Sequence, residues 1–118
     1  MFLILFVLHN PEKANDILDA WEECGVSGIT ILASTGLARL RKGAALREDF
    51  PIIPSLSDLL DQEEILNRTF MTIIKDELLV DKVIAATESI LGDLNQPNTG
   101  ILVVLPVLRA YGLDRVYE

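Results

Sequence analysis

The chain has 118 residues, half of them hydrophobic and 24% charged, with a formal net charge of -8. This length predicts one domain, residues 1–118, and the acidic charge excludes general affinity for nucleic acids or anionic membranes, which needs a basic face. The single Cys24 excludes an internal disulfide and fits a reducing compartment. The apolar run Phe2–Leu8 lacks a basic flank and is too short to span a bilayer, so we expect a cytoplasmic protein.

The first third of the chain predicts a strand, a helix and a second strand. Phe2–Leu8 is a continuous apolar run, which is typical of a strand buried on both faces. The Asn-Pro-Glu at residues 10–12 predicts a helix start, and Gly25 predicts a left-handed helix end. A turn at residues 27–28 leads into a second strand, about Ile29 to Ala33. The apolar stripe of the helix is Ala14, Ile17, Leu18 and Trp21.

The last third repeats the same order of elements. Thr69–Ile74 predicts a third strand, and Asp76-Glu77 opens a second helix that ends at Gly92. Ile101–Val107 predicts a fourth strand, with Pro106 near its end or at a sheet edge because proline cannot donate a ladder hydrogen bond. The inward stripe of the second helix is Leu79, Val80, Val83, Ile84, Thr87, Ile90 and Leu91.

The order βαββαβ predicts an α+β fold of the ferredoxin-like kind, with a four-stranded antiparallel sheet and both helices on one face. An open parallel α/β sheet is the alternative, although four strands would make a small one. In an antiparallel sheet covered on one face, apolar and polar residues should alternate. Phe2–Leu8 and Ile101–Leu105 do not alternate. We therefore expect copies of the chain to assemble through the helix-free face of the sheet.

Three short segments carry a resemblance to a known family. They are GVSGIT at residues 25–30, TGLARLRKG at residues 35–43 and TGILVVLPV at residues 99–107. Together they resemble the nitrogen regulatory PII proteins. In that family a Gly-x-Thr turn precedes the second strand, a Gly-aromatic-Gly-Arg-Gln-Lys-Gly run stands at the base of a long loop, and a Gly-Lys-Ile-Phe-Val strand comes last. The resemblance covers roughly Met1 to Arg109.

The resemblance implies a homotrimer whose sheets line a central core and whose subunit clefts bind an adenine nucleotide. It also implies that the long loop, residues 35–66, docks onto a protein target, with membrane contact only through a membrane-protein target. The positions that match or adjoin the ligand-binding motifs of the family are Thr30, Gly36, Arg39, Arg41, Lys42, Asn98, Thr99, Gly100 and Arg109.

The sequence also departs from the family pattern. The glutamine that helps to bind metal and 2-oxoglutarate is absent, which argues against 2-oxoglutarate as the effector. We expect no metal site. Ile101 stands in place of the lysine before the last strand, and Gly112 in place of one of two closing arginines. Because fewer cations weaken charge-assisted binding of a triphosphate, the pattern disfavours ATP and leaves a smaller adenylate or another small anion. The loop tyrosine of the family has no counterpart between Thr35 and Leu66.

Two features of the long loop have alternative interpretations. Its first half contains the cations Arg39, Arg41, Lys42 and Arg47, which form either an anion site or a solvated surface. Its second half, residues 50–66, contains FPIIP and a short leucine-rich helix pattern. This half is either an arm that orders on a partner or a lid on its own subunit.

The chain lacks the usual catalytic motifs: it has no G-x-S-x-G, no P-loop and no G-x-G-x-x-G. With one histidine and one cysteine it has no zinc set, so we expect neither an enzyme nor a resident cofactor. RNA-recognition domains share the topology but need exposed aromatics on the sheet, which argues against that class. The leading hypothesis is a PII-like signal-transduction protein of nitrogen regulation. The alternatives are a structural or adaptor oligomer with a degenerate ligand site and, with less support, a divalent-cation-tolerance type of oligomer.

Overall fold

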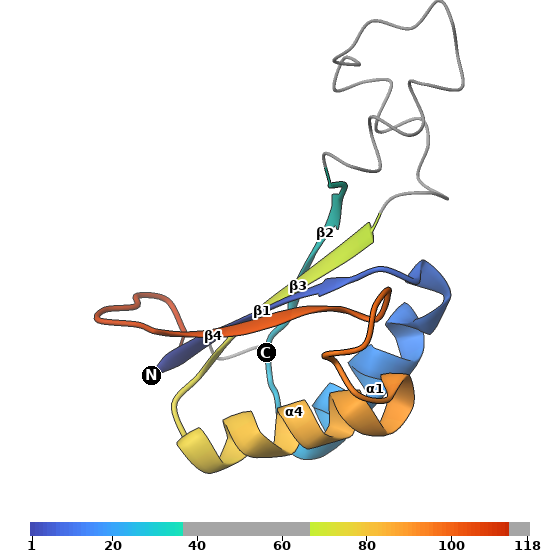
Figure 1. Ribbon diagram of the computed structural model, residues 1–118. Coiled ribbons are helices and arrows are strands. Elements are labelled where there is room, and N and C mark those ends of the chain that lie inside the picture. Colours follow the sequence, from blue (N-terminus) through green and yellow to red (C-terminus); the bar gives the residue numbers. More distant parts are fainter. Residues whose placement is uncertain (37–66, 114–118) are drawn as a thin grey trace, which may run out of the picture.

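The computed structural model describes residues 1–36 and 67–113 (Figure 1). The predicted strands and helices form close to their predicted bounds. The third strand begins two residues earlier than predicted, and the fourth spans residues 100–106. The elements are β1 (Phe2–Leu8), a 3₁₀ turn (Pro11–Lys13), α1 (Ala14–Cys24), β2 (Thr30–Ser34), β3 (Asn67–Ile74), α4 (Glu77–Leu91) and β4 (Gly100–Pro106).

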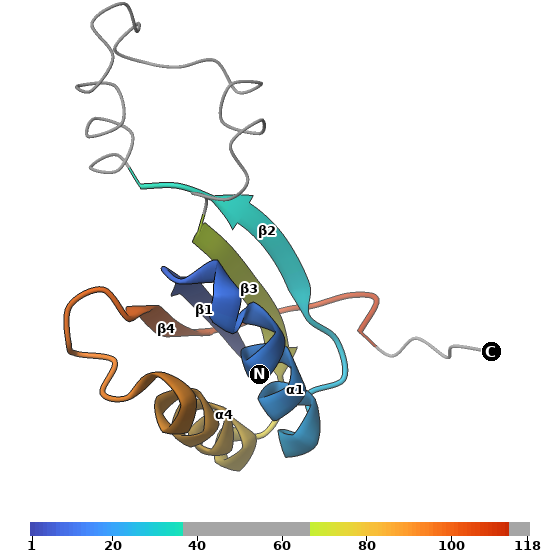
Figure 2. The same ribbon diagram turned by 90° about the vertical axis from the view of Figure 1, so that its right-hand side faces the viewer.

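The four strands form one sheet in the order β2-β3-β1-β4, and every neighbouring pair is antiparallel. Both helices lie on the same face of this sheet (Figures 1 and 2). The structure therefore confirms an α+β fold compatible with the ferredoxin-like arrangement. The alternative of a parallel α/β sheet is wrong, because each strand runs opposite to its neighbours.

Local sequence signals set the helix ends. The Oδ1 atom of Asn10 accepts a hydrogen bond from the N–H of Glu12, 3.1 Å away. Asp76 caps α4 in the same way through the N–H of Leu78, at 2.9 Å. Gly25 closes α1 with a φ of 108°, a left-handed conformation that glycine adopts without steric cost. The helix predicted from residue 10 begins instead with a 3₁₀ turn, in which Lys13 N–H bonds the carbonyl of Asn10.

The core lies between the sheet and the two helices. Its centre is a cluster of three fully buried aromatic rings, Phe6 of β1, Phe70 of β3 and Trp21 of α1, with ring centroids 5.7–6.2 Å apart. Such spacings suit tilted and offset ring contacts, which add to the free energy of burial. The other fully buried side chains of the core include Ile4, Leu8, Ile17 and Val83.

One buried polar chain ties the two helices together. The indole N–H of Trp21 donates to the hydroxyl of Thr87, 2.9 Å away, and that hydroxyl donates to the carbonyl of Val83 at 2.7 Å. All of these side chains are fully buried. Because a buried N–H without a partner costs free energy, Thr87 fixes the position of the indole.

We expect Thr87→Val to lower the free energy of unfolding by about 1–3 kcal/mol, because the buried indole N–H of Trp21 loses its acceptor. The matched control is Ser89→Ala on the same helix, whose exposed hydroxyl bonds only the carbonyl of Ala86. It should change stability by less than about 0.5 kcal/mol. Urea unfolding followed by circular dichroism, at one protein concentration, measures both. Equal stability of the two variants would contradict this role of Thr87.

The helix-free side of the sheet, called the open face below, is apolar. In β1, Ile4, Phe6 and Leu8 point to the helices and are fully buried, so the alternating residues Leu3, Leu5 and Val7 point to the other side. The register places further apolar residues beside them on β3 and β4: Met71, Ile73, Ile101, Val103 and Leu105.

Among residues 1–36 and 67–113, β1 therefore has buried side chains on its helix side only, and β4 has no fully buried residue. On the open face Ile101 is 56% exposed and Leu105 is 49% exposed. Apolar and polar residues do not alternate along β1 and β4 because the open face is apolar as well as the helix side. The described helices do not cover this open face. That sister copies cover it stays a prediction. In the described part of the chain, no helix is long and apolar enough to cross a membrane.

Candidate functional site

The fold places two of the predicted ligand-binding segments at the same end of the sheet. Gly36 follows the end of β2, and Asn98, Thr99 and Gly100 lead into β4. Leu8, at the end of β1, pairs with Gly100 on one side and with Arg68 on the other. Arg68 in turn pairs with Ala33 of β2. One row of residues across the sheet thus joins the two segments.

The same row also separates them, because β2 and β4 are the two outer strands of the sheet. Three inter-strand spacings of ~4.8 Å lie between them, which amounts to about 14 Å. A nucleotide phosphate or a small carboxylate cannot contact both segments across that distance. Within one chain, the structure does not bring Gly36 and Asn98–Gly100 into a common site.

The turn before β4 is held by its own hydrogen bonds. The hydroxyl of Thr99 shares its proton between the carbonyls of Gln96, at 2.9 Å, and Leu94, at 3.2 Å. Asn98 has a left-handed φ of 67°, a conformation that asparagine tolerates better than most residues. In this single chain the Thr99 hydroxyl therefore shapes the turn and is not a spare donor for a ligand.

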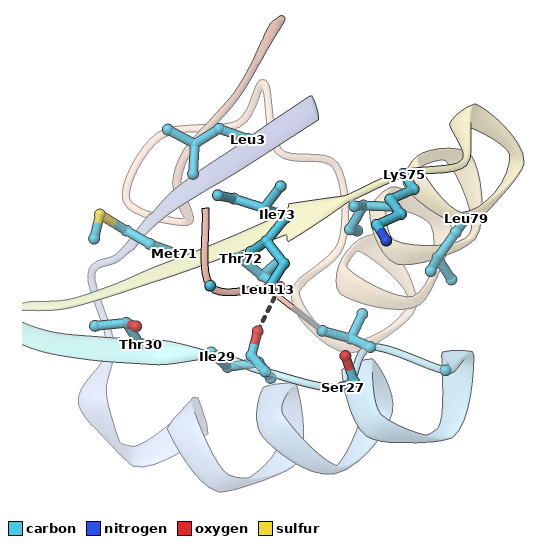
Figure 3. Close-up of a pocket in the computed structure, with 15 residues that line it drawn as sticks. Leu3, Ser27, Ile29, Thr30, Met71, Thr72, Ile73, Lys75, Leu79 and Leu113 are labelled. Atoms are coloured by element: carbon cyan, nitrogen blue, oxygen red, sulfur yellow. Dashed lines mark hydrogen bonds between the residues drawn. The ribbon is translucent and has the colours of Figure 1, made fainter. Parts of the chain in front are cut away.

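Thr30 lies at a different place, beside an open pocket of about 610 Å³ (Figure 3). The pocket is bounded by the turn between α1 and β2, the end of β3 and residues 112–113. Its apolar wall includes Leu3, Met71 and Ile73 of the open face, and the hydroxyls of Ser27 and Thr30 provide polar groups. A pocket with apolar walls and a few polar groups is typical of small-molecule sites.

One side of this pocket is fixed by a long-range hydrogen bond. The hydroxyl of Thr72 on β3 donates to the carbonyl of Gly28, which holds the turn against the sheet (Figure 3). Lys75 is the charged residue among the lining residues, all of which belong to the described part of the chain. The sequence analysis did not predict Ser27 and Lys75 as pocket residues. Ser27 precedes the Gly-x-Thr turn, and Lys75 directly follows the predicted strand Thr69–Ile74, so both positions could have been noticed.

The remaining predicted ligand-binding residues are not among those described at the Gly36 end of the sheet or in the lining of the pocket beside Thr30. Arg109 is exposed and follows β4, whose last residue Pro106 pairs with Phe2. It therefore lies beyond the end of the sheet opposite to Gly36, about 20 Å away along a seven-residue strand. Arg39, Arg41 and Lys42 lie outside the described residues, as does most of the predicted loop 35–66.

Among residues 1–36 and 67–113, no group of three or more His, Cys, Asp or Glu side chains could hold a metal ion. No protein-family model matches the chain, and no curated protein matches it. The resemblance to PII proteins therefore depends on two features of the sequence. They are the three segments quoted above and the βαββαβ order of the predicted elements.

Proposed function

We propose that the protein is a PII-like regulatory oligomer, a trimer by the resemblance, that senses a small anionic metabolite at clefts between its subunits. The observation that supports this most is the placement of Gly36 and Asn98–Gly100 at one end of the sheet but on opposite edges. A second copy of the chain can bring an Asn98–Gly100 segment to Gly36, whereas one chain alone cannot. The open face supplies the apolar surface that would hold such copies together.

The proposed ligand is an adenine nucleotide or a small anion of similar charge. The pocket beside Thr30 is not part of this cleft, because it lies next to Ile74 and Lys75, at the end of the sheet opposite to Gly36. Arg39, Arg41 and Lys42 follow Gly36 closely in the chain and supply positive charge for phosphate or carboxylate groups. The long loop, residues 35–66, would report the bound state to a protein target.

A thermal-shift screen tests this function. We expect at least one of AMP, ADP, ATP, a cyclic nucleotide, bicarbonate or 2-oxoglutarate to raise the melting temperature by several degrees at millimolar concentration. Arg39→Ala should abolish the shift, because Arg39 follows Gly36 by three positions in the chain and we expect its guanidinium to contribute to holding the anion. Lys13→Ala is the control, since Lys13 is an exposed cation in the 3₁₀ turn, and it should leave the shift unchanged. A shift that survives Arg39→Ala would contradict the assignment.

A structural or adaptor oligomer is the second candidate. The observation that favours it is the engagement of the Thr99 hydroxyl by carbonyls of its own turn, next to Ile101 where PII proteins have a lysine. An adaptor would show the mass of an oligomer but no melting shift with any of these ligands. A ligand-dependent shift would exclude a purely structural role.

A further inference from the structure

The pocket beside Thr30 lies where β3 continues past the start of β2 (Figure 3). The pairing of β2 with β3 begins at Thr30 and Met71, whereas β1 pairs with β3 as far as Ile74. Within the described part of the chain, residues 72–74 therefore have a paired strand on one side only. Along a strand, successive residues direct their N–H and C=O groups alternately to the two sides. At least one of these three residues thus offers backbone hydrogen-bonding groups on the pocket side.

The turn that forms the facing wall of the pocket is fixed at both ends. Val26 is 6% exposed in the core, and its N–H bonds the carbonyl of Trp21 at 3.1 Å. Two residues further on, the carbonyl of Gly28 accepts the hydrogen bond of Thr72. The turn is thus anchored to α1 and to β3. The pocket therefore exists before a ligand arrives, which lowers the entropic cost of binding.

Apolar side chains line the length of the pocket. They come from the open face, from the first turn of α4 and from the segment that follows β4. A ligand between them would lose its contact with water on several sides, which favours an apolar ligand. The residues with the largest of these side chains are Leu3, Met71, Ile73, Leu79 and Leu113.

One cation stands at one end of the pocket. Lys75 lies with Leu79 at one side of the lining, and Met71 and Thr30 lie at the other (Figure 3). Lys75 and Met71 are four residues apart, which amounts to about 13 Å along the strand direction. Lys75, Ser27 and Thr30 are all exposed, so a ligand can reach their polar groups. The pocket is therefore long and apolar, with a positive charge at one end.

The charge of the lining limits the charge of the ligand. Among the described lining residues, Lys75 is the charged one. A single ammonium balances a single negative charge. A diphosphate or triphosphate would keep unbalanced negative charge beside a protein whose own net charge is -8. A monoanion with an apolar body fits both the charge and the walls.

We propose that this pocket binds a small apolar monocarboxylate, such as a medium-chain fatty acid. The carboxylate lies at Lys75, and the apolar body runs along Ile73 toward Met71, covered by Leu113. The pocket is at the end of the sheet opposite to Gly36. It is therefore a second site, and it does not depend on the proposed function.

Nuclear magnetic resonance titration of the ¹⁵N-labelled full chain tests this site. The probes are butanoate, hexanoate and octanoate, with 1-hexanol as the uncharged analogue. We expect saturable shifts at residues 25–30 and 71–75, with a Kd that falls about fourfold for each added CH₂ group. Hexanoate should bind at least about tenfold more tightly than 1-hexanol, because only hexanoate carries the charge.

Removing the cation tests the position of the carboxylate. Lys75→Gln should raise the Kd of octanoate at least about tenfold and leave the binding of 1-hexanol unchanged. The matched control is Lys82→Gln, which removes an exposed cation of α4 that does not belong to the lining. It should leave both values unchanged. Circular dichroism verifies that each variant has kept the fold.

The apolar wall has its own matched pair of variants. Leu113→Ser should raise the Kd of octanoate at least about threefold, because the apolar body loses its cover. Leu108→Ser is the control in the same segment, since Leu108 is 95% exposed and does not line the pocket. It should leave the Kd unchanged. Equal effects of the two changes would contradict the proposed path of the apolar body.

Three results would overturn the proposal. They are the absence of saturable shifts with octanoate at millimolar concentration, unchanged octanoate binding in Lys75→Gln, and displacement of octanoate by inorganic phosphate or AMP. The last result would show that the pocket takes phosphate ligands instead. The nucleotide test above is separate, because it depends on Arg39, whereas octanoate binding should persist in Arg39→Ala. Either site can therefore fail while the other stands.

Discussion

Replacing Leu5 with glutamate should convert the proposed oligomer into single chains. Leu5 lies on the central strand β1 and points to the open face, between its cross-strand partners Met71 and Val103. In a single chain the carboxylate would face water. In the oligomer it would be buried without a partner, which costs several kcal/mol per copy. Since 1.4 kcal/mol is a factor of ten, we expect the dissociation constant to rise at least about a hundredfold.

Sedimentation velocity over a concentration series measures this change. The control is Leu78→Glu, which introduces the same charge at an exposed leucine on the helix side of the molecule. It should keep the mass of the unmodified protein. If Leu5→Glu also keeps that mass and its circular dichroism spectrum, the open face is not the surface through which copies assemble.

Replacing Gly100 with alanine should lower stability more than the same change at Gly25, Gly28, Gly36 or Gly92, where an added Cβ would meet no atom within 4 Å. Gly100 has a φ of 151°, and a Cβ there would lie 2.5 Å from the carbonyl oxygen of Val7 and 2.8 Å from the ring of Phe6. The neighbours are backbone and a fully buried ring, which cannot move away cheaply. Backbone strain and overpacking together should lower the free energy of unfolding by about 3 kcal/mol or more.

The matched control for this substitution is Gly28→Ala. A Cβ at Gly28 would meet no atom within 4 Å, and its φ is not in the left-handed region. That change should shift stability by less than about 1 kcal/mol. Denaturant unfolding followed by the fluorescence of the single buried Trp21 measures both variants. A Gly100→Ala variant as stable as Gly28→Ala would show that β4 can shift away from β1 at little cost.

The parts of this fold that depend on local sequence could be predicted. The capping bond of Asn10 and the left-handed end at Gly25 involve residues within one helical turn, and both form as predicted. Apolar runs located all four strands, and the repeated β-α-β order gave the antiparallel sheet. The 3₁₀ turn at Pro11–Lys13 was not predicted, because proline favours the first turn of either kind of helix.

Long-range features could not be predicted from the same patterns. The pocket beside Thr30 depends on the bond from Thr72 to Gly28, whose residues are 44 positions apart. The residues predicted to bind one ligand proved to lie on opposite edges of the sheet, since lateral strand order is a property of the packed chain. The PII resemblance implied clefts between subunits, and that two copies bring Gly36 and Asn98–Gly100 together stays a prediction.

The proposed function requires the open face to be buried between copies of the chain, and the mass of the native protein in solution tests this burial most directly. In sedimentation equilibrium at micromolar concentration, we expect a closed oligomer with about three times the 13.1 kDa mass of one chain. A single species of 13.1 kDa at that concentration would contradict the account, because Leu5, Val103 and their neighbours would then face water without a partner.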